Sequence, residues 1–577
     1  IDRPDLGIVV EKVHFQSLRG LYVTGNLYRP RTFTGRLPAI LYLCGHGRVA
    51  IDGVSYGNKA HYQHHAAWFA RHGYVVLVID TLQLGEIEGA HHGTYRLGEW
   101  WWVSRGYTPA GVEAWNSLRA IDLLASRPEV DPERIGVTGR SGGGIGTWWL
   151  AALDDRPQAF VPVAGITDLE NHVLDGAIEG HCDCNYTINY YGWDYPLLAA
   201  LAAPRPLLLS NSDKDTIFPL DGVLRVHGAL QATYGSLRAT DRLGLLITEG
   251  PHRDTQELQV PAFRWMARWL KGGEPPVVTI PAEPRFDPRE LKVFAELPSD
   301  EINTRIQHRF VPKAEAPAAP ATLSELDALR ERWLADLART TFRSVPEIGK
   351  PEIVRDESVP HGGDALRRIV IRSDSFELPI YVLSARERPA RIVLRTLLDE
   401  EWSTFRMAIG ENARGRLVRE SPDDVAYAFF PPRGIGPTRW SDDDKERNHI
   451  RRRFLALGRT LAETRIFDLR NAVRALRSHD DFAGAELVLE GAGDGAVLAL
   501  WAAIFEDEVR ELRLEALPAS HESSGAELLG VLRVLDLPQA LSLVLPRRVI
   551  LDQPKGDVSW ALDAAKVFGE SGLIEVR

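Results

Sequence analysis

The sequence is poor in sulfur and lacks long apolar runs, and each shortage excludes a class of protein. Its 577 residues include three cysteines, an odd number that excludes a disulfide framework as the basis of the fold. No stretch approaches the roughly 18 uncharged apolar residues of a membrane span, so no membrane partner is expected. Acidic side chains outnumber basic ones, 79 to 68, and the net charge of −11 argues against nucleic acid as the main partner.

The composition that remains is that of an ordinary globular protein. Hydrophobic residues make up 44% of the chain and charged residues 25%, which is enough apolar material for substantial cores and excludes disorder for most of the chain. The sequence opens at Ile1 without a methionine or a signal peptide, which indicates a processed or trimmed N-terminus. We expect a secreted or periplasmic protein, with a cytoplasmic one as the alternative.

Polar-aromatic residues are concentrated in the first half of the chain. Ten of the 15 tryptophans and 12 of the 17 histidines precede residue 273. Between 273 and 349 proline recurs, as in the Ala/Pro-rich run 314–320. These shifts predict a first domain over 1–272, a linker with some local structure over 273–349, and a second domain over 350–577.

Residues 1–272 alternate short apolar segments rich in β-formers with amphipathic segments. The clearest strand is Tyr74–Asp80, an apolar run closed by an acid, which is typical of a buried parallel strand. Helices fit between the strands, for example Pro109–Ser126, which has a proline in its first turn. The alternation predicts an α/β fold with a mostly parallel sheet flanked by helices, and binding sites at the carboxyl ends of the strands.

The central motif is Gly139-Arg140-Ser141-Gly142-Gly143, the pattern G-x-S-x-G. It follows the predicted strand Arg134–Thr138 and opens a predicted helix, the context in which this pattern carries a nucleophilic serine. The glycines are needed because side chains on either side of such a tight turn would collide with the neighbouring strand and helix. We predict that Ser141 is the nucleophile; the alternative is a glycine-rich turn without chemistry.

Two later segments supply an acid and a base. Asp215 follows a predicted strand over 206–209, and His252 follows a predicted strand over 243–248. In this order His252 would take the proton of Ser141, and Asp215 would hold the imidazole in the right tautomer. Asp213 is the alternative acid; Asp215 is preferred because it stands four residues before Pro219.

An acyl-transfer site also needs two donors for the oxyanion. The amide of Gly142, next to the nucleophile, is the first. The second is expected from the loop after the strand Ala39–Leu43, with the backbone N–H of Arg48 as first choice and Gly47 as the next. Cys44 in the same loop is predicted to be a small buried residue, because Ser141 already fills the role of nucleophile.

These motifs resemble those of α/β-hydrolases of the acetyl xylan esterase and dienelactone hydrolase kind. The resemblance rests on Gly45-His46-Gly47, on the motif around Ser141, on Asp215 with Pro219, and on His252. It covers residues 1–272. It implies hydrolysis of carboxylic esters, often acyl groups on plant polysaccharides, without a metal or an organic cofactor.

Two polar-aromatic stretches, Leu84–Tyr107 and Gly165–Pro204, leave the carboxyl ends of predicted strands and are expected to rim the active site. An aromatic plane there would suit a sugar ring. The side chains predicted to contact substrate are Glu86, His91, Trp100, Trp101, His181, Tyr190 and Trp193.

Clusters of histidine and cysteine raise the alternative of a metal site. His61, His64 and His65 share one face of a predicted helix, and Cys182 and Cys184 stand two residues apart. Cys-x-Cys is not a usual zinc spacing, and a serine hydrolase needs no metal. We interpret both groups as polar lining or packing, and predict neither a metal site nor a cofactor.

Residues 350–577 repeat the pattern of the first region without its chemistry. The segment 487–495 matches 135–143, so that Gly493 stands 352 positions after Ser141. A second match pairs Pro389 with Pro38 at an offset of 351. No histidine follows the last predicted strand, Leu573–Val576. We predict a second, catalytically degenerate α/β-hydrolase-like domain; the alternative is two unrelated α/β domains.

The function that follows is that of a serine carboxylesterase acting on short acyl groups of a carbohydrate, such as acetylated xylan. One alternative keeps the triad but cuts amides, as in peptidases of the prolyl-oligopeptidase type. Such peptidases usually carry a β-propeller, and no propeller-like repeat of short strands is visible in the sequence. Another alternative is a non-catalytic carbohydrate-binding or scaffold protein, which would need Ser141, Asp215 and His252 to lie apart.

Overall fold

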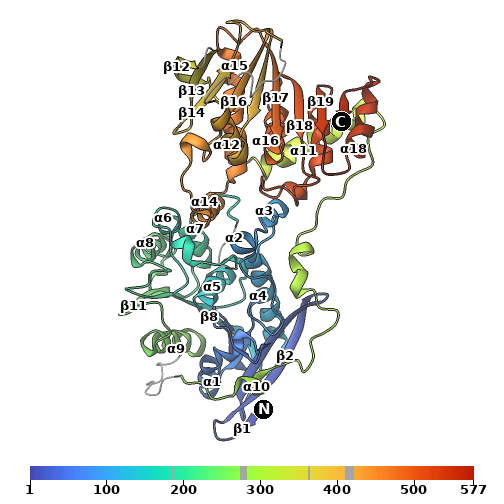
Figure 1. Cartoon of the computed structure of the whole chain (residues 1–577). Coiled ribbons are helices and arrows are strands. Elements are labelled where there is room, and N and C mark those ends of the chain that lie inside the picture. The colour runs from blue at the N-terminus through green and yellow to red at the C-terminus, as the bar shows by residue number, and fades with distance from the viewer. Residues whose placement is uncertain (185–187, 273–281, 362–363, 410–421) are drawn as a thin grey trace. The chain divides into compact units, whose positions relative to one another are not determined.

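The computed structural model describes residues 1–184, 188–272, 282–361, 364–409 and 422–577, which form two compact units (Figure 1). Unit 1 comprises Ile1–Leu97 and Thr108–Phe310, and unit 2 comprises Gly98–Tyr107 and Val311–Arg577. Each unit contains a nine-stranded sheet among its described residues. None of the helices described is both long and apolar enough to cross a membrane.

The sheet of unit 1 has the strand order β1-β2-β3-β7-β4-β8-β9-β10-β11. Strands β1 to β3 pair antiparallel, β3 also pairs antiparallel with β7, and the strands from β7 to β11 run parallel. The strands are β1 (Asp2–Arg3), β2 (Ile8–Leu18), β3 (Leu21–Pro30), β4 (Leu37–Leu43), β7 (Val75–Ile79), β8 (Val130–Arg140), β9 (Ala159–Val163), β10 (Leu207–Ser212) and β11 (Leu243–Thr248). A separate two-stranded sheet joins β5 (Ala50–Ile51) to β6 (Val54–Ser55).

Helices cover both faces of this sheet, because the sides of its central strands are all apolar. In β7, Leu77 packs into a cluster with Trp148 of α5, while the next residue, Val78, packs with Phe69 of α1 on the opposite face. The helices are α1 (Gln63–Arg71), α2 (Gly93–Leu97), α4 (Pro109–Ser126), α5 (Gly142–Leu153), α6 (Leu169–Val173), α7 (Tyr195–Ala199), α8 (Leu220–Ser236), α9 (Gln256–Lys271) and α10 (Pro288–Leu291). The predicted α/β-hydrolase fold is confirmed.

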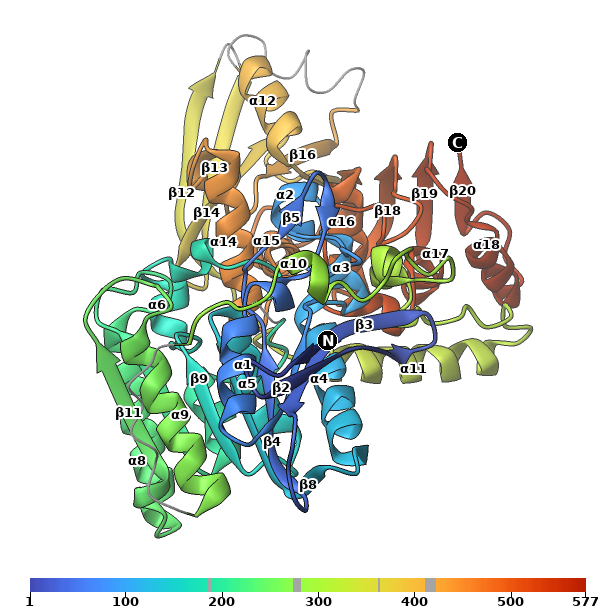
Figure 2. The same ribbon diagram turned by 90° about the horizontal axis from the view of Figure 1, so that it is seen from below.

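The sheet of unit 2 has the order β12-β13-β14-β16-β15-β17-β18-β19-β20, which repeats the order of unit 1 strand for strand. In Figure 2 the parallel strands β18, β19 and β20 lie side by side. The strands are β12 (Glu352–His361), β13 (Asp364–Ser373), β14 (Phe376–Leu383), β15 (Arg391–Thr396), β16 (Val425–Phe430), β17 (Glu486–Ala492), β18 (Val509–Glu515), β19 (Arg548–Asp552) and β20 (Ile574–Val576). The helices are α3 (Trp101–Arg105), α11 (Leu323–Arg339), α12 (Asp399–Ala408), α14 (Asp444–Ala456), α15 (Leu461–Ser478), α16 (Asp494–Ile504), α17 (Leu537–Ala540) and α18 (Ser559–Ala565).

The backbone repeats as well as the strand order. Ser141, between β8 and α5, has φ 59° and ψ −119°, and Gly493, between β17 and α16, has φ 54° and ψ −121°. Each turn is followed by an alanine with positive φ after the next strand, Ala164 at 46° and Ala516 at 49°. Unit 2 therefore has a strand-to-helix turn of the same conformation as that of unit 1, with glycine at the position of the serine.

The unit boundaries differ from those that composition suggested. Residues 98–107, placed by the sequence in the first domain, group with unit 2. The stretch predicted as a linker over 273–349 is divided at Phe310: its described residues up to 310 belong to unit 1, and those from 311, including α11, belong to unit 2. Composition misled here because proline-rich segments are packed against a unit rather than left between units. Ala314, for example, donates a backbone hydrogen bond to Leu532 at 2.8 Å.

The turn of unit 2 should accept a serine at Gly493 more readily than a side chain at Gly491. A Cβ added at Gly493 would meet nothing within 4 Å, although the φ of 54° there is strained for a side chain, whereas one added at Gly491 would lie 2.3 Å from the Gly495 carbonyl oxygen. We expect Gly493→Ser to lower the free energy of unfolding by about 1–2 kcal/mol and Gly491→Ala to lower it by about 3 kcal/mol or more. Urea titration of both variants measures the difference. Equal losses would show that the turn does not discriminate between the two positions.

A buried histidine should make unit 2 sensitive to acid. His521 is fully buried and its Nε2 accepts a hydrogen bond from the Trp501 indole at 3.3 Å, so the ring must be neutral. Burial lowers the pKa of His521 to about 4, against about 6.5 for an unfolded imidazole. Between these values the unfolded chain binds the extra proton, so stability falls as the pH is lowered from about 6.5 to 4, by about 2–4 kcal/mol.

The measurement is urea unfolding at pH 7 and pH 4.5, compared between the native chain and His521→Gln. The variant should lose part of the acid sensitivity, whereas His308→Gln, which removes an exposed imidazole, should keep it. Identical pH dependence in all three proteins would contradict the assignment to His521.

Candidate active site

Ser141 occupies a strained turn between β8 and α5. Its φ of 59° lies in the left-handed region, which side chains other than glycine rarely adopt. Its amide donates to the Val163 carbonyl at 2.9 Å, which fixes the turn to the neighbouring strand. The motif glycines are required, since a Cβ at Gly139 would lie 2.4 Å, and one at Gly143 1.9 Å, from the Leu43 carbonyl oxygen.

The predicted acid and base meet at the carboxyl ends of β10 and β11. His252 Nδ1 lies 2.7 Å from Asp215 Oδ2. The other carboxylate oxygen of Asp215 accepts the amides of Ile217 at 2.9 Å and Phe218 at 3.0 Å, and the side chain is buried. A carboxylate held in this way fixes the proton on Nδ1 and leaves Nε2 as the basic nitrogen.

Asp213, the alternative acid, has a different task. Its Oδ1 accepts the amide of Gly250 at 2.8 Å, and its own amide donates to the Thr248 carbonyl at 2.9 Å. These bonds tie the loop after β10 to the loop that carries His252. The structure thus places Asp215, and not Asp213, on the imidazole.

The loop expected to supply the second oxyanion donor lies against the nucleophile. A Cβ added at Gly45 would lie 3.2 Å from the Ser141 Cβ and 2.4 Å from the Arg140 carbonyl oxygen. Gly47, one of the two expected donors, uses its amide in a turn to the Gly45 carbonyl at 3.0 Å, which leaves it unavailable in this conformation. The Arg48 amide donates to no group within the described residues, so it is available to an oxyanion. The Arg48 side chain pairs with Glu88 at 3.0 Å. The amide of Gly142, first residue of α5, is a first-turn amide without an intrahelical partner.

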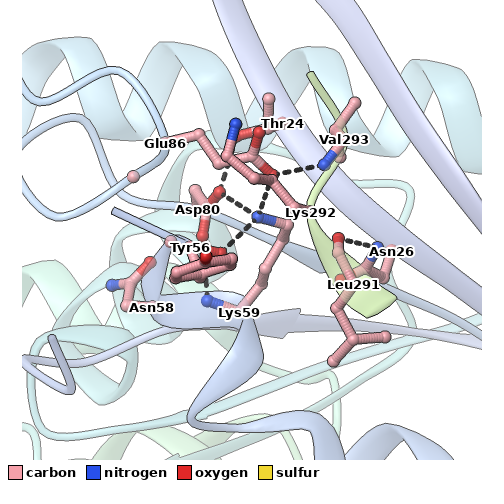
Figure 3. A network of polar contacts seen from close by, with 12 residues as sticks. Thr24, Asn26, Tyr56, Asn58, Lys59, Asp80, Glu86, Leu291, Lys292 and Val293 are labelled. Carbon is pink, nitrogen blue, oxygen red and sulfur yellow. Dashed lines mark hydrogen bonds and ion pairs between the residues drawn. The ribbon is translucent and has the colours of Figure 1, made fainter. Parts of the chain in front are cut away.

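Glu86 was predicted to contact substrate, but its carboxylate is instead part of a buried ion network (Figure 3). Its carboxylate lies 2.6 Å from Lys59 Nζ and accepts the amides of Val293 at 2.7 Å and Phe294 at 3.0 Å. Lys59 Nζ also pairs with Asp80 at 2.8 Å. Glu86 therefore anchors the segment around 293 to the core of unit 1.

Trp100 and Trp101 belong to unit 2, which corrects their prediction as substrate contacts of the first domain. Trp100 is 6% exposed and lies under the Arg451 guanidinium, whose carbon is 3.8 Å from the ring centroid. Trp101 is half-buried, and its indole donates to Glu99. The polar-aromatic composition of this stretch predicted a substrate-binding rim, but the Trp100 and Trp101 rings pack within unit 2.

The insertion between β9 and β10 mixes packing with exposed aromatic surface. His181 is 2% exposed, its Nε2 lies 3.1 Å from the Ile217 carbonyl oxygen, and its ring packs on Phe218, so it supports the loop of Asp215. Tyr190 is half-buried. Trp193 is 45% exposed and stacks on Tyr191 at 4.8 Å between ring centroids. Of the predicted contacts from this insertion, the Trp193 ring has the open face that a sugar needs.

His91 stacks between two other imidazoles. Its ring centroid is 5.7 Å from that of His46 and 3.7 Å from that of His92. Burial lowers the pKa of His91, and burial together with the imidazoles of His91 and His252 lowers the pKa of His46 to about 4. His46 and His91 are therefore neutral at pH 7.

Two clusters bring possible metal ligands together. His46 Nε2 lies 2.9 Å from Cys182 Sγ and 3.1 Å from Cys184 Sγ, and the two sulfurs are joined in a disulfide. As a disulfide the sulfurs are not thiolate ligands. The third cysteine, Cys44, is buried, as predicted.

The other cluster comes from helix α1 and the loop after His252. His64 and His65 both place Nε2 on Asp254 Oδ2, at 3.1 and 2.9 Å. Burial would raise the pKa of Asp254, but the two imidazoles outweigh it and hold that pKa well below its usual range. Burial lowers the pKa of His65 to about 4, despite the nearby carboxylate. The cluster ties the segment two residues beyond His252 to α1; the sequence showed the histidine face but gave no signal for its acidic partner.

The family described as the prolyl oligopeptidase family matches residues 60–271. "Putative hydrolase YtaP" of Bacillus subtilis is 28% identical over 261 residues, which cover 42% of this chain and 82% of that protein. "Dipeptidyl-peptidase 5" of Porphyromonas gingivalis is 33% identical over 102 residues, 18% of this chain and 14% of that one.

Among solved structures, "Methylesterase BT1017" has a TM-score of 0.38 at 26% identity and covers 52% of this chain and 64% of that one. A glucuronoyl esterase from Solibacter usitatus has a TM-score of 0.37 at 16% identity, with coverage of 45% and 81%. The family match lies within unit 1, and the sheet order together with the turn at Ser141 gives unit 1 the α/β-hydrolase fold.

Proposed function

From this fold and this pairing of acid and base, we propose that unit 1 is a serine carboxylesterase that removes short acyl groups from carbohydrate through an acyl-enzyme. The observation that carries the proposal is the 2.7 Å contact between His252 Nδ1 and Asp215, at the edge of the sheet where the strand before Ser141 also ends. A paired acid and imidazole that share an edge of the sheet with a strained serine are what acyl transfer requires.

Each group has one task in the proposed reaction. His252 Nε2 removes the proton from the Ser141 hydroxyl as its oxygen attacks the ester carbonyl, and Asp215 stabilises the imidazolium. The amides of Gly142 and Arg48 hold the oxyanion. The alcohol leaves with the proton from His252. Water then attacks the acyl-enzyme as His252 takes its proton, and the Ser141 oxygen leaves with that proton as the acid is released.

A carbohydrate substrate is supported by the exposed aromatic surface of the insertion. Tyr191 and Trp193 are 55% and 45% exposed and stacked, so they present a flat apolar plane to solvent. Such a plane suits the apolar face of a sugar ring better than a flexible acyl chain. The substrate is thus proposed to be an acetylated oligosaccharide of the xylan kind.

A peptidase is the second candidate, favoured by the match to the prolyl oligopeptidase family over residues 60–271. The same triad would serve, since acyl-enzyme formation is common to esters and amides. The two candidates differ in the leaving group, an alcohol or an amine, and kinetics with matched substrates separates them.

We expect release of acetate from acetylated xylo-oligosaccharides to exceed both hydrolysis of long-chain aryl esters and cleavage of dipeptide anilides, by about tenfold or more in kcat/KM. The assay is a side-by-side measurement on one preparation, with Ser141→Ala as the blank. Faster cleavage of the anilides would assign the chain to peptidases. A preference for long-chain esters would exclude the carbohydrate substrate.

A further inference from the structure

Unit 2 contains a cavity of about 600 Å³ at the carboxyl ends of β15, β16 and β17. Its walls come from the loops that follow these strands, from α14 and from the start of α15, all of which are labelled or traced in Figure 1. This volume lies within the range of small-molecule sites, and the edge of the sheet is where α/β folds bind ligands. Unit 1 carries Ser141 at the corresponding position.

The base of the cavity is the retained turn at Gly493. Because a Cβ at this position would meet nothing within 4 Å, the space used by the nucleophile in unit 1 is open here. The neighbouring Asp494 carboxylate accepts the Ser524 hydroxyl and the Gly525 amide, both at 2.8 Å, so it is held in place at the start of α16. The turn therefore forms part of the cavity wall and carries no nucleophilic side chain.

One cation facing the cavity makes no direct ion pair among the described residues. Arg451 pairs with Glu527 at 3.1 Å, and Arg447 pairs with Asp444. Arg465, by contrast, has only a bond from Nε to the Arg433 carbonyl at 3.1 Å, and no carboxylate within ion-pair distance among the described residues.

The charge on Arg465 persists at neutral pH. Burial, helped by the nearby Arg451, lowers the pKa of Arg465 to about 10. Asp399, Glu527 and Asp468 favour its charge from beyond ion-pair distance, but a guanidinium that is largely withdrawn from water without a direct ion pair remains costly. Its free N–H groups are arranged to bind a carboxylate in the bidentate manner. This side chain points to a ligand that brings one negative charge.

The remaining lining suits hydroxyl groups and a flat ring. Asp399, Glu400 and Glu401 add carboxylate oxygens, which accept hydrogen bonds from hydroxyls. The Trp440 ring also lines the cavity and is half-buried, close to Gly434, where a Cβ would lie 2.7 Å from it. A doubly charged phosphate would be repelled by so many carboxylates, whereas a ligand with one carboxylate and several hydroxyls fits.

We propose that unit 2 binds an acidic sugar in this cavity, a uronic acid residue of an oligosaccharide, with its carboxylate on Arg465, its hydroxyls on the acidic wall and its ring against Trp440. This binding site does not depend on the reaction proposed for Ser141. It goes beyond the esterase proposal by giving the second sheet a recognition task of its own.

The test is calorimetric titration of the Ser141→Ala chain with glucuronosyl-xylobiose, a trisaccharide with one carboxylate, so that hydrolysis cannot interfere. Xylotriose and inorganic phosphate serve as the neutral and the non-sugar anionic ligands. We expect glucuronosyl-xylobiose to bind about 10- to 100-fold more tightly than xylotriose, the difference of a charge-assisted contact. Equal binding of xylotriose, tighter binding of phosphate, or no binding of glucuronosyl-xylobiose would overturn the proposal.

Variants then locate the site. Arg465→Gln should weaken glucuronosyl-xylobiose binding about 10- to 100-fold, and Arg465→Lys should restore part of it. Arg372→Gln removes a guanidinium of unit 2 that pairs with Glu352 on an exposed strand, and it should bind as the parent does. Unchanged binding by Arg465→Gln would place the sugar elsewhere and refute the site.

Hydrogen exchange of the Ser141→Ala chain provides a reading that does not depend on how the Arg465 variants fold. Glucuronosyl-xylobiose should slow exchange in residues 434–465 and 492–498, which border the cavity. Protection confined to unit 1 would overturn the proposal even if affinity were high.

Discussion

Replacing Ser141 with alanine should lower kcat for a short-chain aryl acetate by about 10³-fold or more. The hydroxyl is the only group lost, and alanine differs from serine by that oxygen alone, so the turn at φ 59° should persist. The measurement is the steady-state rate together with a thermal unfolding curve, which separates lost chemistry from lost folding.

The matched control is Ser117→Ala. Ser117 is also buried in unit 1, and its hydroxyl donates to the Glu113 carbonyl at 2.8 Å within α4. This variant should keep a near-native rate. If Ser141→Ala itself kept a near-native rate, another residue would have to be the nucleophile.

The acid can be tested by a similar comparison. Asp215→Asn should lower kcat by about 10³-fold or more, because the amide would favour the wrong imidazole tautomer. Asp213→Asn should have a much smaller effect, since Asp213 holds the Gly250 amide rather than His252. The reverse ranking would identify Asp213 as the acid and show that the loop rearranges on binding.

Replacing Lys59 with methionine should lower the free energy of unfolding by about 3–5 kcal/mol, the second large effect expected for this chain. The Lys59 and Glu86 side chains are fully buried, and that of Asp80 is 3% exposed (Figure 3). Burial raises the pKa of Asp80, and Lys59 opposes that rise by supplying the positive charge. Without it, two carboxyl groups remain buried next to each other.

Urea unfolding measures the loss, with Arg31→Met as the control. Arg31 pairs with Asp2 at 3.0 Å where both side chains are about half exposed, and its removal should cost less than about 1 kcal/mol. Similar losses in the two variants would mean that the Lys59 network contributes no more than a surface ion pair.

The sequence was most informative where local rules dominate. Strand β7 was visible as an unbroken apolar run, and the turn at Ser141 was visible because its glycines admit no side chain. The pairing of Asp215 with His252 followed from chain order and strand ends. In each case the physical constraint acts within a few residues or along one edge of the sheet.

The sequence was least informative where a side chain's role depends on distant partners. Glu86 and Trp100 resemble substrate-binding residues in composition, yet one is paired with Lys59 and the other packs under Arg451 in the other unit. Asp254 carried no signal at all, because its partners, His64 and His65, lie some 190 residues earlier. Such contacts are set by tertiary packing, which a single sequence does not display.

The excursion of residues 98–107 into unit 2 has a consequence for how the chain can be divided. The polypeptide crosses between the units three times, at 97–98, 107–108 and 310–311, so neither unit is one uninterrupted stretch. A protease that cuts only at 310–311 separates the larger piece of unit 2 from residues 98–107, which carry Trp100 and Trp102, unless the two fragments remain associated. Fragment complementation, rather than independent folding, is therefore the behaviour to expect: pieces 1–310 and 311–577 should co-purify after a single nick, held by a ten-residue segment threaded into the partner fragment.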